Sequence, residues 1–118
     1  MDAAQAVKAL AALAHAHRLA IYRLLVETGP EGLPAGAIAE RIGLVPSSLT
    51  FHVQALRHAG LVSVERVGRQ LFYAADFPTM NGLVDYLTRN CCGGSQSCPP
   101  VCKPATTRKS GARARRTG

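Results

Sequence analysis

The chain has 118 residues, a formal net charge of +7 at pH 7 and an apolar fraction of 47%. That length fits one domain with a thin hydrophobic core, and so small a domain commonly dimerises to bury more apolar surface. No apolar run is long enough to span a bilayer, and Asp2 stands where a secretory signal would be basic. We therefore expect a cytoplasmic protein that has no membrane partner and keeps its cysteines reduced.

The positive charge is concentrated at the C-terminal end. From residue 103 onward there is no acidic residue, and the basic residues are Lys103, Arg108, Lys109, Arg113, Arg115 and Arg116. Without them the chain is close to neutral, so the high isoelectric point describes a tail rather than a folded surface. Residues 103–118 lack hydrophobic periodicity, which predicts disorder. The tail either adds non-specific attraction to DNA or is a solvated end without a role.

Two helices are predicted in the N-terminal part, over residues 3–14 and 18–26. The apolar face of the first carries Ala3, Val7, Leu10 and Ala14. Between the two helices, His15 and His17 interrupt the pattern. They could ligate a metal, or they could sit at a helix junction and bind water or a carbonyl, and no other ligand type lies near them in sequence. Residues 28–34 are rich in Gly and Pro and are predicted to form a loop.

Residues 33–43 and 44–62 read as two short helices joined by a tight turn. Pro46 suits a first helical position, because it lacks only an N–H that the helix would not use. Gly60 suits the far end, where a left-handed residue stops a helix at little cost. A short helix, a glycine-containing turn and a second helix with a polar face form a helix-turn-helix.

The second of these helices has one apolar stripe and one polar face. Leu49, Val53 and Leu56 are spaced to face a core. The opposite side carries groups that can reach base edges or phosphates, and no acid occurs in the helix. The alternative is a solvated face in an ordinary helical domain. The residues predicted to enter the major groove are Ser47, Ser48, Thr50, Phe51, Gln54 and Arg57.

A β-hairpin with a basic tip is predicted directly after this helix. Residues 61–64 and 70–74 favour strands, and residues 66–69 read as the turn between them. The expected fold is therefore mainly α with a small β-hairpin, an α+β winged helix-turn-helix. Its wing would contact DNA phosphates or the minor groove through Arg66, Arg69 and Gln70.

At this point the sequence resembles the ArsR/SmtB repressors, over about residues 5–90. The resemblance implies a homodimeric winged-helix repressor that a bound metal or metalloid ion releases from DNA. The matching residues are Leu13-Ala14, Arg18-Leu19, residues 21–25, Ser47–Thr50, His52-Val53, Leu56, residues 59–62, Arg66, Gly68-Arg69 and Tyr73.

The last helix is predicted over residues 77–90, with Asp76 as its N-cap. Its apolar stripe is too extensive to leave in water, and the alternative to an interface is an intramolecular core. The resemblance implies that the first and last helices pack on their symmetry mates. The predicted interface residues are Val7, Leu10, Met80, Leu83, Val84 and Leu87. A two-fold dimer predicts an inverted-repeat operator with half-sites ~34–36 Å apart.

Two metal sites known in this family are not expected here. One uses cysteines near the start of the first helix of the helix-turn-helix, and this chain has no cysteine before residue 91. The other uses Asp and His residues on the last helix, which here contains Asp85 but no histidine.

All cysteines lie just after the last helix, at Cys91, Cys92, Cys98 and Cys102. Adjacent cysteines are poor disulfide partners, because their Cα atoms are held ~3.8 Å apart, below the usual ~4.4 Å limit. Glycines after Cys92 let the chain turn back and bring Cys98 to the same point. Three converging thiolates select a soft ion. The spacing resembles arsenite-responsive ArsR repressors, in which these three cysteines bind As(III).

Several interpretations of the cysteines remain open. Cys102 has no counterpart in the three-ligand pattern and could be a spare, a redox partner for Cys98 or a fourth ligand. A four-sulfur site would favour cadmium, lead or zinc, although structural zinc usually shows paired knuckles. A structural disulfide is the remaining alternative.

The predicted organisation has three parts: a winged-helix domain over residues 1–90, a cysteine-rich segment over 91–102 and a basic tail over 103–118. The predicted function is a repressor that leaves DNA when As(III), or Sb(III), binds, without an organic cofactor. A thiol metal carrier that does not bind DNA is the second hypothesis, and it would not need a basic wing. An enzyme is not expected, because no phosphate loop or Cys-His-Asp arrangement is present.

Overall fold

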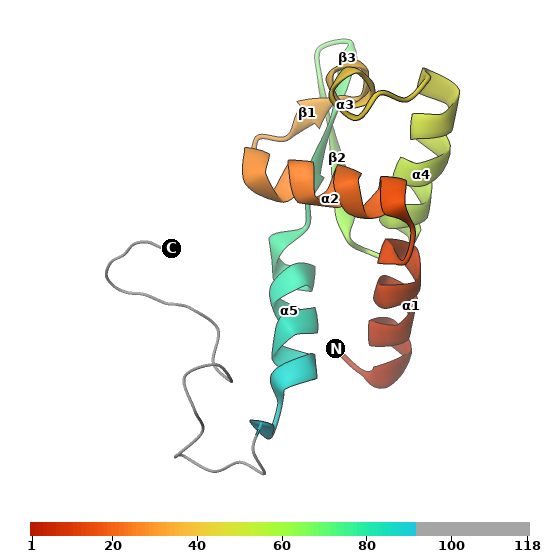
Figure 1. Ribbon diagram of the computed structural model, residues 1–118. Coiled ribbons are helices and arrows are strands. Elements are labelled where there is room, and N and C mark those ends of the chain that lie inside the picture. The colour runs from red at the N-terminus through yellow and green to blue at the C-terminus, as the bar shows by residue number, and fades with distance from the viewer. Residues whose placement is uncertain (92–118) are drawn as a thin grey trace. The chain divides into compact units, whose positions relative to one another are not determined.

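A computed structural model describes residues 1–91 of the chain (Figure 1). Residues Met1–Tyr86 form one compact unit, and a second unit begins at Leu87. In chain order the elements are α1 (Ala3–Leu13), α2 (Ala16–Thr28), β1 (Leu33–Pro34), α3 (Ala35–Ile42), α4 (Pro46–His58), β2 (Val62–Val67), β3 (Gln70–Ala75) and α5 (Phe77–Thr88).

Helix α1 begins at a capping box and buries alanine. The Gln5 backbone N–H donates to the Asp2 carboxylate (2.8 Å), and the Asp2 N–H donates to the Gln5 side chain (2.9 Å). The predicted helix is confirmed, and it packs on the core of its own protomer through Ala6, Ala9 and Ala12, a second face that the sequence did not single out. Val7 and Leu10, the larger residues of the predicted face, are 65% and 43% exposed.

Helix α2 supplies the centre of the hydrophobic core. Its buried residues Ile21 and Leu25 pack with residues of the next two helices, Ile38 on α3 and Leu49 and Leu56 on α4. Within residues 1–91 no single helix is long and apolar enough to span a membrane. Only α1 and α2 taken together pass that test, and they meet at a 103° bend.

A short strand, β1, precedes the helix-turn-helix. Leu33 pairs with Tyr73 and Pro34 with Phe72 on β3. The sequence predicted a loop that passed directly into a helix here, and this boundary was wrong, because α3 begins only at Ala35. Gly32, just before β1, has a φ of +71° and approaches the Tyr73 backbone so closely that a side chain would not fit.

The helix-turn-helix is confirmed. Helix α3 ends at Gly43, which adopts the left-handed conformation (φ 82°, ψ 34°). Pro46 opens α4 as predicted. At the other end, the Gly60 N–H donates to the Arg57 carbonyl and the Leu61 N–H donates to the Leu56 carbonyl. This Schellman pair, with Gly60 at φ 80°, stops α4 where the sequence predicts.

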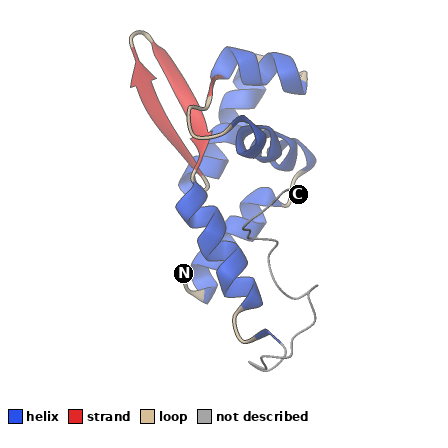
Figure 2. Ribbon diagram, turned by 90° about the vertical axis from the view of Figure 1, so that its left-hand side faces the viewer, coloured by secondary structure: helices blue, strands red, loops and turns tan. Residues whose placement is uncertain are grey.

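Strands β2 and β3 form the predicted hairpin, which projects from the helices (Figure 2). They extend further than predicted, so that Arg66 lies in β2 and only Gly68 and Arg69 make the turn between Val67 and Gln70. Gly68 has a φ of +63°, as a tight two-residue hairpin turn requires. With β1 the hairpin makes an antiparallel sheet in the order β1-β3-β2. The architecture is a winged helix-turn-helix.

Helix α5 begins as predicted and ends earlier. The Thr79 N–H donates to the Asp76 carboxylate (3.0 Å), which confirms the N-cap. The helix ends at Thr88 rather than at residue 90, and Asn90 follows with a φ of +60°. Cys91 therefore lies beyond the helix.

Candidate nucleic-acid interface

The outer face of α4 carries the side chains predicted to enter the major groove. Leu49, Val53 and Leu56 anchor the opposite face, each at most 1% exposed, and this fixes which way the helix turns. The large ring of Phe51 is 65% exposed, although burial would be worth ~1.5–3 kcal/mol to it. The predicted groove residues all reach the surface; Ser48 and Gln54 are half-buried, and the exposed ones are Ser47, Thr50, Phe51 and Arg57.

Local hydrogen bonds orient two of these side chains. The Thr50 hydroxyl donates to the Pro46 carbonyl (3.0 Å). The Thr50 oxygen can still accept a hydrogen bond through its lone pairs. The Arg57 guanidinium donates to the Gln54 amide oxygen (3.4 Å), a long contact that uses one of its donors. Both groups therefore keep the capacity to bind DNA.

The interface is cationic, and no ion pair within the described residues neutralises its arginines. Arg57, Arg66 and Arg69 take part in no ion pair within residues 1–91. All three arginines are exposed, as is Gln70. Glu65 precedes Arg66 on β2, but successive side chains of a strand point to opposite faces. These cations are therefore available to phosphates.

A polar cluster lies beside this face, and the sequence did not predict it. The N-terminal end of α2 lies next to α4 (Figure 1), where the Arg18 Nε donates to the His52 Nδ1 (3.2 Å). The ring centroids of His15 and His52 are 4.6 Å apart, and that of His17 lies 5.7 Å from each. The Arg18 guanidinium also lies 5.6 Å from the Phe51 ring centroid, a cation–π contact. We call His15, His17, Arg18 and His52 the histidine cluster.

The histidine cluster has an electrostatic signature. Burial lowers the pKa of His52 below its usual 6.5, and the nearby His15, Arg18 and His17 lower it further. The sequence shows the His15-Ala-His17 motif and the histidine on α4. No local pattern indicates that these histidines come together.

Among residues 1–91 no group of three or more His, Cys, Asp or Glu side chains could hold a metal ion, so His15 and His17 are not ligands of such a site. They sit instead at the junction of α1 and α2, where the His15 ring caps α2 by accepting from the His17 N–H. Cys91 is half-buried after α5, and the other predicted ligands, Cys92, Cys98 and Cys102, lie outside the described residues.

The predicted interface residues divide into two groups. Leu83 is buried and Met80 is partly buried, both against the core of the same protomer. On α1 the exposed pair is Val7 and Leu10; on α5, Val84 and Leu87 are 42% and 57% exposed.

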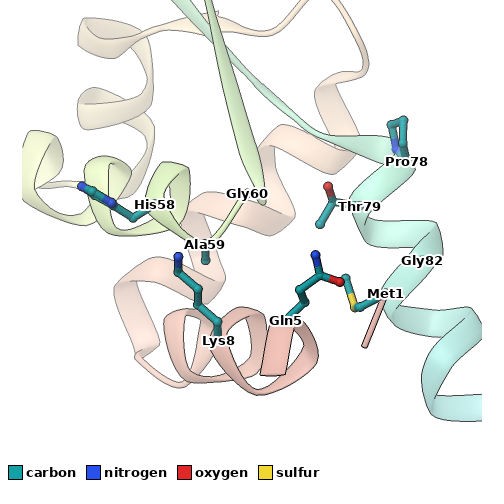
Figure 3. Close-up of a pocket in the computed structure, with 9 residues that line it drawn as sticks. All are labelled: Met1, Gln5, Lys8, His58, Ala59, Gly60, Pro78, Thr79 and Gly82. Atoms are coloured by element: carbon teal, nitrogen blue, oxygen red, sulfur yellow. The ribbon is translucent and has the colours of Figure 1, made fainter. Parts of the chain in front are cut away.

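A cavity of about 440 Å³ lies at the C-terminal end of α4 (Figure 3). Lys8 and Gln5 point into it from α1, and Thr79 from α5. His58, Ala59 and Gly60 close it from the α4 side. The C-terminal end of α4 therefore borders an open space that residues of α1 and α5 also line.

Comparison with known proteins agrees with the fold. A family described as "Helix-turn-helix domain" matches residues 13–65. The transcriptional activator HlyU of Vibrio cholerae is 30% identical over 95 residues, covering 80% of this chain and 85% of HlyU.

Two solved structures extend the comparison. An ArsR-like transcriptional regulator from Rhodococcus sp. RHA1 has 30% identity and a TM-score of 0.64, covering 73% of this chain and 78% of the regulator. The homodimeric winged helix-turn-helix DNA-binding domain of Mb0332 from Mycobacterium bovis, a possible ArsR-family regulator, has 27% identity and a TM-score of 0.58, with 78% and 85% covered. With its helix-turn-helix, its basic wing and these relatives, the chain belongs to the ArsR family of winged helix-turn-helix transcriptional regulators.

Proposed function

We propose that this protein is a homodimeric repressor that binds an inverted-repeat operator and is released when As(III) binds Cys91, Cys92 and Cys98. The observation that carries the DNA-binding part is the exposed face of α4, which has no acid, exposes Phe51 and continues into a wing with two unpaired arginines. The cation–π contact with Arg18 leaves most of the Phe51 ring in water, and contact with a thymine methyl group would account for its exposure.

Within the interface the side chains have different tasks. Gln54 has the amide geometry that reads adenine in the major groove, and Ser47, Ser48 and Thr50 can donate to bases or phosphates. Arg66, Arg69 and Gln70 on the hairpin would bind phosphates or the minor groove, which positions the protein without reading sequence.

A dimer would bring two recognition helices to one operator. Val7 and Leu10 on α1, and Val84 and Leu87 on α5, expose apolar surface that a second copy could cover. The similar domain from Mycobacterium bovis is described as homodimeric. Repression is proposed because a dimer seated on an operator blocks other proteins, but the relative from Vibrio cholerae is named an activator. The direction of regulation therefore needs its own test, by transcription from the bound promoter.

Thiolate chemistry supports As(III) as the inducer. Cys91 and Cys92 are adjacent just beyond α5, and Cys98 can reach them across a glycine-containing segment. Three thiolates suit a trivalent, thiophilic centre such as As(III) or Sb(III). A tie between Cys98 and the end of α5 would load the helix proposed to lie in the dimer interface, and that interface sets the separation of the two recognition helices.

The size of the switch is set by differential binding. Arsenite can weaken operator binding only by the ratio of its affinities for the DNA-free and the DNA-bound protein. A useful switch needs a coupling free energy of ~1–3 kcal/mol or more. Linkage is reciprocal, so operator DNA must weaken arsenite binding by the same factor.

Gel shift with and without arsenite tests the proposal. Duplex selected by the protein from a random library should shift, and arsenite should abolish the shift. Cys98→Ser should bind the duplex normally and resist arsenite, whereas Cys102→Ser, the matched control, should respond nearly as the wild type does. If arsenite still released the Cys98→Ser variant from the duplex, the proposed three-cysteine site would be wrong.

The same experiment separates the alternatives. If Cys102→Ser no longer responds, and cadmium, lead or zinc releases the wild type better than arsenite, the site has four sulfurs and a different metal. If the protein selects no duplex but binds the metal, it is a thiol metal carrier.

Two substitutions at the interface test the assignment of roles. Gln54→Ala should reduce discrimination between operator and mutated operator by ~1–3 kcal/mol. Arg69→Ala should weaken binding to all duplexes alike and lower the slope of log affinity against log salt by about one unit. Wild-type behaviour of both variants in a salt titration would show that α4 and the hairpin are not the DNA-binding surface.

A further inference from the structure

We propose that the histidine cluster binds a backbone phosphate of the operator and takes up a proton as it does so, so that DNA affinity rises as the pH falls. This inference rests on the proposed DNA-binding function. It adds a phosphate contact outside the helix-turn-helix and the wing, and it makes operator binding sensitive to pH.

The position of the cluster fits a phosphate contact. The Arg18 guanidinium lies over Phe51, which is exposed on the face proposed to enter the major groove. His52 is the next residue along α4, and its ring lies 5.5 Å from that of Phe51. The cluster therefore begins where the base-reading face ends. A helix seated in the major groove has a phosphate strand along each flank.

The hydrogen bonds of the cluster fix which nitrogens can donate to a phosphate. Arginine only donates, so the bond from Arg18 requires an unprotonated Nδ1 on His52 and places its hydrogen on Nε2. The His17 backbone N–H donates to His15 Nδ1 (3.1 Å), which requires the same tautomer of His15. Each of these neutral rings therefore keeps an Nε2–H donor.

Within residues 1–91 the cluster has cationic groups but no counter-anion. The groups that shift the His52 pKa are His15, Arg18 and His17, and all act to lower it. None of the other charged side chains on the elements that pack against α4 shifts the His52 pKa. These side chains are Lys8, Arg23, Glu27, Glu40, Arg41, Glu65 and Arg66. A phosphate would supply the missing negative charge.

The sign of the pH effect follows from this arrangement. In the unbound protein the pKa of His52 is lowered, and a bound phosphate would raise it. The complex then holds more protons than its separated partners. The gain in affinity is complete below the pKa of the unbound state and is lost as the pH rises through the pKa of the complex. Protonation of Nδ1 also ends the bond from Arg18, which leaves the guanidinium available to the same phosphate.

The test uses a variant that keeps the hydrogen bonds but cannot take up a proton. In the full chain, His15→Asn and His52→Asn place an amide oxygen where Nδ1 accepts, and asparagine is also a good N-cap. His17→Gln removes the third ring. The matched control is His58→Gln, because His58 is exposed on the same helix and lies outside the cluster.

Fluorescence anisotropy at constant ionic strength measures the affinity for a duplex selected by the wild type at about pH 7.5. Between about pH 8 and pH 5.5, the wild type and His58→Gln should gain up to ~10-fold in affinity per pH unit, the limit for one linked proton. The triple variant should show little gain. The salt slope of the wild type should also steepen by about one phosphate at the lower pH, and that of the triple variant should not.

The outcomes are distinct. A triple variant that keeps the wild-type pH dependence, or a wild type whose specific binding does not change with pH, overturns the inference while leaving the proposed function intact. Failure of the wild type to select any duplex at any pH defeats the proposed function instead. If the triple variant does not fold, His52→Asn alone carries the test, because His52 is the ring proposed to take up the proton: a reduced pH dependence supports the cluster, and an unchanged one overturns it.

Discussion

Replacing Gly32 by alanine tests the strand pairing at the base of the wing. A Cβ at Gly32 would lie 2.3 Å from the Tyr73 carbonyl oxygen and 2.8 Å from its carbon. Contact distances of that kind are normally above 3 Å, so β1 or β3 must move by most of an ångström. Backbone atoms cannot rotate aside as a flexible side chain does, and the movement would break the pairing of Leu33 with Tyr73.

Two costs add in this variant. An L-residue held at a φ of +71° costs ~1–2 kcal/mol, and overpacking against backbone costs a further ~1–3 kcal/mol. The sum, ~2–5 kcal/mol, is a large part of the ~5–15 kcal/mol that stabilises a typical domain. For a domain of this size each kcal/mol lowers Tm by ~4–8 °C.

Two other glycines provide matched controls. Gly43 has a φ of +82° but nothing within 4 Å of its added Cβ, so Gly43→Ala should lose only the ~1–2 kcal/mol of the backbone term. Gly36 lies inside α3 without either constraint, and Gly36→Ala should stabilise by ~0.5–1 kcal/mol. Urea unfolding at one fixed protein concentration measures all three, since dimerisation makes stability concentration-dependent. If Gly32→Ala loses no more stability than Gly43→Ala, the close approach to Tyr73 is not real.

Val7→Asp should leave the protomer folded, because Val7 is 65% exposed, but it should bury a charge in the proposed interface and give monomers that do not bind the operator. Sedimentation that shows an intact dimer would remove this face of α1 from the interface. Asp76→Ala should cost ~1 kcal/mol in thermal unfolding through loss of the α5 cap, and Asp76→Asn should restore most of it. Within residues 1–91 the buried Tyr22 hydroxyl has no hydrogen-bond partner, so Tyr22→Phe should match or exceed wild-type stability near pH 7. Burial, and then Asp76, raise the Tyr22 pKa above 10. The wild type should therefore lose stability as the pH rises past the unfolded-state value, and Tyr22→Phe should lose less in urea titrations at alkaline pH.

The elements that follow local rules were predictable from the sequence. Pro46 and Gly60 mark the two ends of α4, and Asp76 marks the start of α5, because caps depend on the residue itself. Strand β1 was missed because a two-residue strand has no alternation to detect. It exists only through its pairing with β3, which is a tertiary contact.

The face of α1 that packs on the core of its own protomer was not predicted. The sequence singled out Val7 and Leu10 as dimer-interface residues, and they are exposed, whereas alanines make the close contact with the core, and Ala9 is completely buried. Packing distance, rather than the apolar character of the residue, decides which face turns to the core.

The candidate site also has parts that the sequence predicted and parts that it did not. The groove and wing residues were predicted because α4 and the hairpin each place them by periodicity, and they do lie on the surface. The histidine cluster was not predicted, because it joins residues 15–18 to His52 across a long stretch of chain. The predicted use of Cys92, Cys98 and Cys102 stays a prediction, since those residues lie outside the described part of the chain.

These features converge on one helix. Helix α4 is fixed to the core by its apolar stripe, bears the proposed base-reading residues, carries one ring of the histidine cluster and ends at a cavity that it shares with α1 and α5. A signal at the cluster acts near its middle, whereas a signal passed through α5 would act at its C-terminal end. If both proposed signals change the affinity for the same operator, linkage requires that each changes the apparent affinity of the protein for the other whenever DNA is bound. Without DNA, substitutions in the histidine cluster should leave the affinity for arsenite unchanged; with operator DNA bound, they should change it. An effect that appears only with DNA shows that the two sites are coupled through the operator, whereas an effect without DNA would show direct coupling between them.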